Sequence, residues 1–262
     1  MIKFCSLFSG SSGNSIFVGT EDTKILIDAG LSGKKVAEAL DSIGEDPTRL
    51  SAIFITHEHS DHIGGVGILS RRYNIPIYAN KKTWDAIGKS LGKLSEDNKK
   101  TIEGDVLFTD MRVRGFSTSH DAADPLGYSF FHDGKKVTVA TDTGVITDTV
   151  RQNVLDSDVV LLESNHDIDM LKNGRYPYYL KKRILGDHGH LSNDTAADFL
   201  VELIENGTER IFIGHLSEEN NTPDIAFDTA CGKLKENGIN PKCDVNLKVA
   251  SRYYASEAVT LK

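Results

Sequence analysis

The chain has 262 residues and a formal net charge of −8, with 39% hydrophobic and 26% charged residues. This composition is that of a globular protein and excludes a disordered one, and the acidic balance gives no global basic footprint for nucleic acid, although a local groove can still be basic. No apolar run reaches the ~20 residues of a membrane span, and residues 1–8 lack the features of a signal peptide.

Cysteine usage bears on the cellular compartment. Cys5, Cys231 and Cys243 are odd in number and form no Cys-x-x-Cys pair. This favours a reducing environment without a disulfide framework. We therefore expect a cytoplasmic protein with no membrane association.

The first quarter of the chain predicts a small sheet and a helix. Apolar runs bounded by turn residues predict strands at 2–8, 16–18 and 24–28. Between the first two lies the Ser/Gly-rich loop 9–15, which has the composition of a backbone anion nest or of a plain hairpin loop. The spacing of apolar residues predicts a helix over 34–43. Asp28 ends its strand. It is expected either to cap a turn or helix there or to orient a metal-bound histidine through its carboxylate.

The next strand, predicted at 52–56, is wholly apolar and leads into the stretch Thr56–His62. Three of the nine histidines and one aspartate fall between positions 57 and 62. Imidazole and carboxylate are ligands of zinc and its first-row neighbours. Turn chemistry gives no reason for repeated histidine, so the stretch predicts a metal site.

The remainder alternates strands and helices. The predicted strands and helices, in chain order, are helix 63–73, strand 75–78, helix 83–91, strands 106–108 and 111–116, hairpin 127–131/136–140, strand 158–163, helix 193–206, strand 211–216, helix 224–238 and strand 247–254. No internal repeat, low-complexity tract or linker interrupts this order. We therefore expect one domain, 1–262.

Four separate predicted strands end in a potential metal ligand. They deliver His57 with His59, then His120, Asp142 and His215. A single histidine such as His215 at a strand end is usually structural, but strand ends at one sheet edge converge. The repetition therefore favours a shared site.

The order Asp28, the 57–62 cluster, His120, Asp142 and His215 resembles the metallo-β-lactamase superfamily over nearly the whole chain. The resemblance implies an α/β fold of four αββα layers. It also implies two divalent metal ions, Zn²⁺ or Mn²⁺ with iron also accepted. The implied ligands are His57, His59 and His120 for one ion, Asp61, His62 and His215 for the other, and Asp142 bridging both.

Within the superfamily the chain is most similar to the YycJ/WalJ-like group. The similarity lies in the segments 10–15, Ser119-His120-Asp121 with Pro125, 161–166 and 189–193. No cysteine occupies the ligand position used by many lactam hydrolases, and the extra domain of larger nucleases is absent. The resemblance implies a metal-dependent phosphodiesterase that cleaves DNA, in preference to RNA, as a 5′ to 3′ exonuclease, with a metal-bridging hydroxide as nucleophile.

Three side chains are candidates for catalysis. Asp61 is expected both to bind metal and to orient the nucleophile. His190 is a candidate donor of the proton to the leaving oxygen, and Glu163 a candidate to hold its tautomer. A helix-start cap explains His190 equally well. The basic residues Lys172, Arg175 and 181–183 are candidates for backbone contacts, or simply a solvated face.

Two other functions fit the sequence. The same ligands suit hydrolysis of a small phosphodiester, lactone or thioester, which the acidity of the chain favours. A non-enzymatic, metal-stabilised regulator or redox scaffold is the third hypothesis. Metal identity, exo- or endonuclease action and oligomeric state are left open by the sequence.

Overall fold

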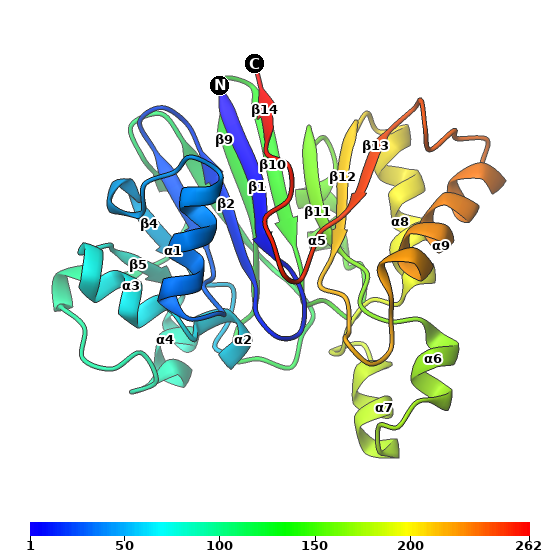
Figure 1. Ribbon diagram of the computed structural model, residues 1–262, viewed down its shortest axis with the longest axis horizontal. Coiled ribbons are helices and arrows are strands. Elements are labelled where there is room, and N and C mark those ends of the chain that lie inside the picture. Colours follow the sequence, from blue (N-terminus) through cyan, green and yellow to red (C-terminus); the bar gives the residue numbers. More distant parts are fainter.

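Two seven-stranded sheets lie face to face at the centre of the molecule, and helices cover their outer faces (Figure 1). The computed structural model describes residues 1–262. The first sheet has the strand order β14-β1-β2-β3-β4-β5-β6. Its strands are β1 (Ile2–Phe8), β2 (Ser15–Gly19), β3 (Lys24–Ile27), β4 (Ala52–Phe54), β5 (Ile77–Ala79), β6 (Lys99–Thr101) and β14 (Val259–Leu261).

The second sheet has the order β13-β12-β11-β10-β9-β8-β7. Both sheets are mixed: β3 to β6 run parallel to one another, as do β10 to β13, and the other pairs are antiparallel. The strands are β7 (Val106–Leu107), β8 (Arg112–Ser117), β9 (Leu126–His132), β10 (Lys135–Ala140), β11 (Val159–Glu163), β12 (Arg210–Gly214) and β13 (Asn246–Val249).

Helices are divided between the outer faces and one end of the sheets. Short 3₁₀ turns occupy Pro47–Arg49 and Glu96–Asn98. The α-helices are α1 (Gly33–Ser42), α2 (Ser60–Ile63), α3 (Val66–Tyr73), α4 (Lys81–Ile87), α5 (Asp148–Val154), α6 (Ile168–Asn173), α7 (Tyr178–Ile184), α8 (Asn193–Glu205) and α9 (Pro223–Glu236).

Three apolar cores account for this layering. One core packs α1 and α3 against the first sheet, and a second packs α5, α8 and α9 against the second sheet. The third core lies between the sheets. There the ring centroids of Phe4 and Phe212 are 5.0 Å apart, and those of Phe54 and Tyr128 are 5.3 Å apart. Burial of side chains from both sheets in one layer holds them together. The predicted αββα architecture is confirmed.

Local sequence explains where the main helices begin. Ser32 and Ser192 each accept a hydrogen bond from the backbone N–H three residues later, which starts α1 and α8. The buried face of α8 includes Ala196, Ala197 and Leu200, as its apolar stripe predicts. None of the helices combines the length and the apolarity that crossing a bilayer requires.

Several predicted boundaries were wrong. The predicted helix 63–73 is observed only from Val66 onward, as α3, and Ile63 instead ends the short helix α2. Backbone atoms of the segment Ala29–Gly33 lie against the two intervening glycines, Gly64 and Gly65. The predicted last strand, 247–254, ends at Val249 because the chain turns away from the sheet edge there; β14 is the last strand. The short elements β6, α5, α6 and α7 were not predicted, since each has too few residues to show a period.

Candidate metal centre and active site

The predicted ligands lie at one end of the two sheets. Asp28 follows β3, His57 follows β4, and His120, Asp142 and His215 follow β8, β10 and β12. In Figure 1 this is the lower end, where α2, α6 and α7 lie, opposite the two chain termini. Strand ends from both sheets therefore converge, as their repetition in the sequence indicated.

The first cluster consists of His57, His59 and His120. The His59 Nδ1 atom lies 3.0 Å from His57 Nε2 and 3.4 Å from His120 Nε2. His57 and His120 are buried, whereas His59 is partly exposed. Three imidazole nitrogens thus meet at one point, a spacing that suits a single tetrahedral ion.

The second cluster consists of Asp61, His62 and His215, with Asp142 beside it. His62 Nε2 lies 3.5 Å from Asp61 Oδ2 and 3.4 Å from Asp142 Oδ2. Asp142 Oδ1 lies 3.2 Å from His215 Nε2 and 3.7 Å from His120 Nε2. Asp142 therefore contacts histidines of both clusters.

Hydrogen bonds on the outer side of these rings direct their inner nitrogens. His62 Nδ1 lies 2.7 Å from Asp28 Oδ2, and His120 Nδ1 lies 3.0 Å from the Gly189 carbonyl oxygen. Asn14 Oδ1 lies 3.1 Å from His215 Nδ1. When each Nδ1–H donates to its oxygen, the Nε2 atom keeps a lone pair toward the cluster.

Thr56 completes this outer layer. Its hydroxyl donates to Asp28 Oδ2 at 2.7 Å and lies 3.0 Å from His57 Nδ1, so it can accept the proton of that ring. Its backbone N–H donates to Asp28 Oδ1. One buried carboxylate thus holds both the Thr56 hydroxyl and the His62 imidazole.

Three of the strand ends adopt the left-handed backbone region. The φ angles are 56° at Asp28, 56° at Asp142 and 54° at His215. Residues other than glycine rarely adopt this region, with Asp, Asn and His the most tolerant. The turn aims each side chain at the cluster, and such local strain is typical of functional sites.

Burial and neighbouring charges together set the pKa values of the side chains in the site. Burial alone would raise the pKa of Asp142, but His215, His62, His57 and His120 hold it well below its usual value. Burial and the neighbouring imidazoles lower the pKa of His57. Burial also lowers the pKa of His62, but Asp142 and Asp28 outweigh it and raise that pKa well above its usual value. A metal ion bound at the clusters would compete with these protons, because imidazole binds metal in its neutral form.

The residues present fit a pair of divalent ions. Asp142 Oδ2 is buried without any hydrogen-bond partner, a costly state for a carboxylate oxygen. The inner nitrogens of the first cluster face one another, so a cation between them would accept their lone pairs. His62 Nε2 also lies 3.1 Å from the amide nitrogen of Asn14. The geometry is consistent with a binuclear site and leaves the identity of the metal open.

His190 and Glu163 lie directly beside this centre. His190 Nδ1 is 2.6 Å from Glu163 Oε1 and 3.9 Å from Asp142 Oδ1. The other Glu163 oxygen accepts the Thr143 backbone N–H at 2.9 Å. Burial lowers the pKa of His190, but the Glu163 carboxylate offsets this and the pKa rises to about 9. The sequence-predicted contact between these two side chains is present.

Other candidate residues lie outside the centre. His188 is exposed and lies 3.1 Å from the Ser119 hydroxyl. Lys181 donates to the carbonyl oxygens of Lys172 and Gly174 and so caps α6, whereas Arg183 pairs with Asp121. These contacts show that the basic run is partly structural.

The Ser/Gly-rich loop 9–15, for which the sequence left an anion nest and a plain hairpin loop open, packs its backbone and side chains against the clusters. The Asn14 backbone N–H donates to the Asp61 carbonyl oxygen, and the Gly13 N–H donates to the Gly10 carbonyl. The Asn14 side chain contacts His62 and His215, and Ser9 Oγ accepts the His215 N–H. Sequence reasoning gave no role to Asn14 or Thr56, although Asn14 lies in the segment 10–15 that carries the resemblance and Thr56 directly precedes the histidine cluster.

Comparison with known proteins defines the class. Residues 9–215 match the model of the metallo-beta-lactamase superfamily. The structure is similar over 98% of the chain to the metallo-beta-lactamase fold protein YhfI from Bacillus subtilis, with a TM-score of 0.71 and 14% identity, and covers 100% of that chain. The chain belongs to the metallo-beta-lactamase superfamily, and fold and site together are those of a metal-dependent hydrolase.

Sequence relatives narrow the assignment further. The chain is 44% identical over 238 residues to exodeoxyribonuclease WalJ of Streptococcus pneumoniae, covering 89% of this chain and 88% of the relative. It is 41% identical over 239 residues to exodeoxyribonuclease YycJ of Bacillus anthracis, covering 90% of each. Within the superfamily the chain belongs to the WalJ/YycJ family, which confirms the resemblance seen in the sequence.

Proposed function

We propose that this protein is a DNA exonuclease that hydrolyses phosphodiester bonds in the 5′ to 3′ direction with two bound divalent metal ions. The observation that carries the proposal is the His190–Glu163 contact beside two histidine-rich clusters. The leaving 3′-oxygen of a phosphodiester needs a proton or a positively charged neighbour, and a protonated His190 supplies either. Two relatives that are 41–44% identical over about 90% of the chain carry the name exodeoxyribonuclease, which supports DNA as substrate.

The proposed ligands divide into two sets. When bound, such ions polarise a phosphoryl oxygen and lower the pKa of water. Asp142 belongs to both sets, and Asn14, Thr56 and Asp28 hold the ligating rings in orientation. The proposed first set is His57, His59 and His120, and the proposed second set is Asp61, His62 and His215.

The remaining steps fall to side chains of this chain. The proposed role of Asp61, whose partly exposed carboxylate lies 3.5 Å from His62 Nε2, is to orient the attacking hydroxide. Attack by hydroxide forms a bond from its oxygen to phosphorus and breaks the bond to the 3′-oxygen. The protonated His190 ring donates its proton to that oxygen and becomes neutral, and Glu163 keeps the ring protonated before the transfer and fixes its orientation.

A labelled-substrate assay tests the proposal. The protein is reconstituted separately with Zn²⁺ and Mn²⁺ and given 5′- and 3′-labelled DNA, matching RNA and a generic phosphodiester. We expect stepwise loss of mononucleotides from the 5′ end of DNA. Cleavage of the generic diester without cleavage of DNA would refute the nuclease and favour the small-substrate hydrolase.

A ligand variant separates metal loss from other defects. Asp61→Ala is expected to abolish turnover together with part of the bound metal, measured by elemental analysis of the dialysed protein. A variant that keeps both ions and full activity would remove Asp61 from the proposed ligand set.

A further inference from the structure

Three cavities follow one another from His190 to α1. The first, of about 150 Å³, is lined by His190, Arg183, Tyr176 and Ser217 among others. The second, of about 290 Å³, shares Ser217 with the first. The third, of about 480 Å³, shares Arg252, Tyr253 and Tyr254 with the second and reaches Lys35 on α1. The shared residues place the three cavities next to one another, in a row that starts beside the candidate centre and is called the path below.

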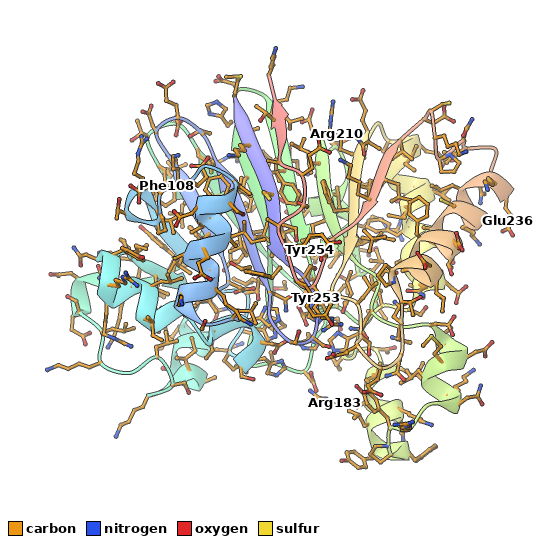
Figure 2. The ribbon with its side chains drawn as sticks, in the orientation of Figure 1. Phe108, Arg183, Arg210, Glu236, Tyr253 and Tyr254 are labelled. Atoms are coloured by element: carbon orange, nitrogen blue, oxygen red, sulfur yellow. The ribbon has the colours of Figure 1, made fainter.

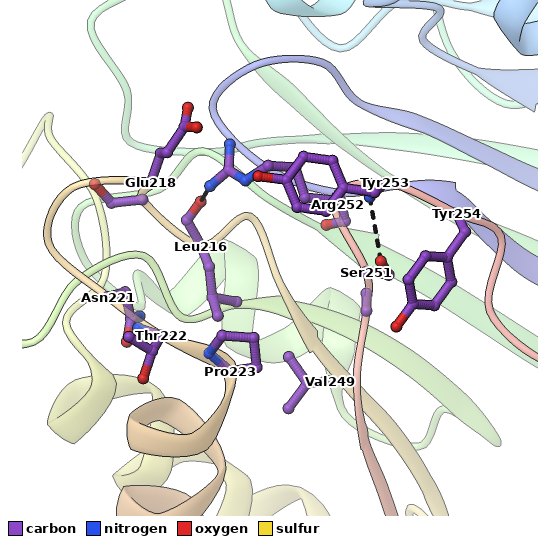
Figure 3. Close-up of a pocket in the computed structure, with 13 residues that line it drawn as sticks. Leu216, Glu218, Asn221, Thr222, Pro223, Val249, Ser251, Arg252, Tyr253 and Tyr254 are labelled. Atoms are coloured by element: carbon purple, nitrogen blue, oxygen red, sulfur yellow. Dashed lines mark hydrogen bonds between the residues drawn. The ribbon is translucent and has the colours of Figure 1, made fainter.

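Two neighbouring tyrosines border this path without being packed into the fold. The exposed fractions of Tyr253 and Tyr254 are 72% and 69%. Figure 3 shows both side chains at the second cavity together with Leu216, Pro223 and Val249. Exposed rings beside an apolar wall are platforms on which planar groups stack.

Arg252 lies where the second and third cavities meet. Its guanidinium donates to the hydroxyls of Ser11 and Ser12 and to the Leu216 carbonyl oxygen. All of these partners are uncharged, so no carboxylate neutralises the side chain. A half-buried cation without a counterion is a site for an anion, and a bidentate guanidinium suits a phosphate.

The two kinds of residue together indicate an occupant. Proteins bind single-stranded nucleic acid with exposed aromatic side chains, on which bases stack, next to positively charged side chains that bind the phosphates. Each cavity also contains one carboxylate, Asp121, Glu218 or Glu38. Because these carboxylates repel phosphates, we expect stacking to contribute more than charge to the binding of a strand along this path. A paired duplex cannot stack on the tyrosine rings, because the faces of its bases are covered by neighbouring bases.

We propose that these cavities hold the substrate strand as unpaired nucleotides, with Arg252 on a backbone phosphate and bases stacked on Tyr253 and Tyr254. The inference rests on the proposed function, because it takes the scissile bond to lie at the metal clusters. It assigns a strand-binding role to the segment 251–255, which contains none of the proposed metal ligands. In Figure 2, Tyr253, Tyr254 and Arg183 are the labelled side chains along this region.

Binding measured without turnover tests the path. The full chain, in excess EDTA, is titrated into an internally labelled oligothymidine and into a blunt duplex of equal length, with fluorescence anisotropy as the readout. Tyr253→Ala/Tyr254→Ala is expected to weaken binding of the single strand at least about tenfold, the size of lost base stacking. Tyr253→Phe/Tyr254→Phe, which keeps the rings, is expected to bind like wild type.

The matched control is Tyr178→Ala/Tyr179→Ala. These two tyrosines on α7 are 81% and 74% exposed and line none of the three cavities, so single-strand binding should not change. For Arg252→Gln we expect the slope of log affinity against log salt to fall by about 0.7, the loss of one phosphate contact on a single strand. Thermal unfolding of each variant checks that the fold is intact.

The possible outcomes distinguish a failure of the proposed strand path from a failure of the proposed nuclease activity. Unchanged binding by the alanine double variant, or equal losses in the alanine and phenylalanine variants, would overturn the stacking role. A preference of the wild type for the blunt duplex would overturn the unpaired strand. Wild-type protein that binds the oligothymidine through the tyrosines but cleaves no DNA would refute the nuclease alone.

Discussion

Asp142 shows at the scale of one residue how this site works. Its carboxylate is buried and would favour protonation, yet the surrounding histidines keep it ionised. One of its oxygens has no hydrogen-bond partner within the protein. Burying such an oxygen without a partner costs free energy, and a cation bound at the clusters would offset that cost.

The role of His190 can be separated from metal binding. For His190→Ala we expect kcat to fall by about 10²–10⁴, the range for loss of a general acid. Metal content should be unchanged, because the proposed ligands do not include this ring. Kinetics on labelled DNA and elemental analysis of the same sample measure the two effects.

The control for this variant is His188→Ala. His188 lies two residues away but is exposed, and the ring contact to Glu163 belongs to His190. The His188→Ala variant should therefore retain the kcat of the wild type. Full activity in His190→Ala, or loss of its metal, would remove the proposed proton donor.

At the scale of elements, the turn after β3 and the short helix α2 pack without a gap. A Cβ atom on Gly30 would lie 1.6 Å from the Asp61 carbonyl oxygen and 2.7 Å from the Asn14 backbone nitrogen. Asp61 belongs to the candidate second metal site, and Asn14 contacts both of its histidines. The absence of a side chain at Gly30 therefore lets three segments meet there.

Gly30→Ala tests this packing. We expect it to lower the free energy of unfolding by about 1–3 kcal/mol, as overpacking does, and to weaken the second metal site by displacing Asp61. Chemical denaturation and metal titration measure the two effects. Gly104→Ala is the control, because a Cβ there meets nothing within 4 Å; equal behaviour of the two variants would contradict the prediction.

A second link between elements lies far from the candidate site. Glu45, just after α1, forms ion pairs with Lys3 on β1 and Lys24 on β3. Burial raises the pKa of Glu45, but hydrogen bonds from the two lysines outweigh it and the pKa is lowered. The ion pairs therefore tie one end of α1 to two strands of the first sheet.

The lowered pKa of Glu45 predicts a pH dependence of stability. The stabilisation is complete above the pKa of the unfolded state, about 4.3, and is lost as pH falls through the folded-state value. Glu45→Gln should cost about 1–3 kcal/mol at pH 7, and the difference from wild type should shrink toward pH 3. Glu209→Gln, at an exposed pair with Arg210, should cost about 0–1 kcal/mol at both pH values; a constant penalty for Glu45→Gln would contradict this account.

At the scale of the whole molecule, the candidate ligands join the two sheets. Asp61 and His62 follow strands of the first sheet, whereas Asp142 and His215 follow strands of the second. Bound ions would therefore act as links between the sheets in addition to the apolar layer. Their contribution grows with free metal as RT ln(1 + [metal]/Kd).

Removal of metal should thus destabilise the chain as one unit. At metal concentrations about 1,000 times Kd, the loss on chelation is about 4 kcal/mol. Calorimetry before and after EDTA should show one transition that shifts to lower temperature, as expected for a single domain with a shared core. Two separate transitions would contradict the single domain, and an unchanged midpoint would contradict the metal linkage.

Sequence reasoning succeeded where the relevant residues are close together in the chain. The apolar stripe of α8 and the alternating hairpin of β9 and β10 are local patterns, and both were predicted. The Glu163–His190 contact was foreseen because each residue ends or begins a recognisable element. The sequence did not predict the helices α5, α6 and α7, which have six or seven residues each. Such short helices depend on packing more than on propensity.

The sequence by itself determined the ligand types and the order of the strands that carry them. Histidines within six positions stay together in any fold, and apolar periodicity follows from local side-chain direction. Only the tertiary structure decided which ring nitrogen faces inward, that Asn14 supports His215 across 201 positions, and that Tyr253 borders the same path as His190. These relations depend on sheet pairing and close packing between distant segments, and no local pattern records them.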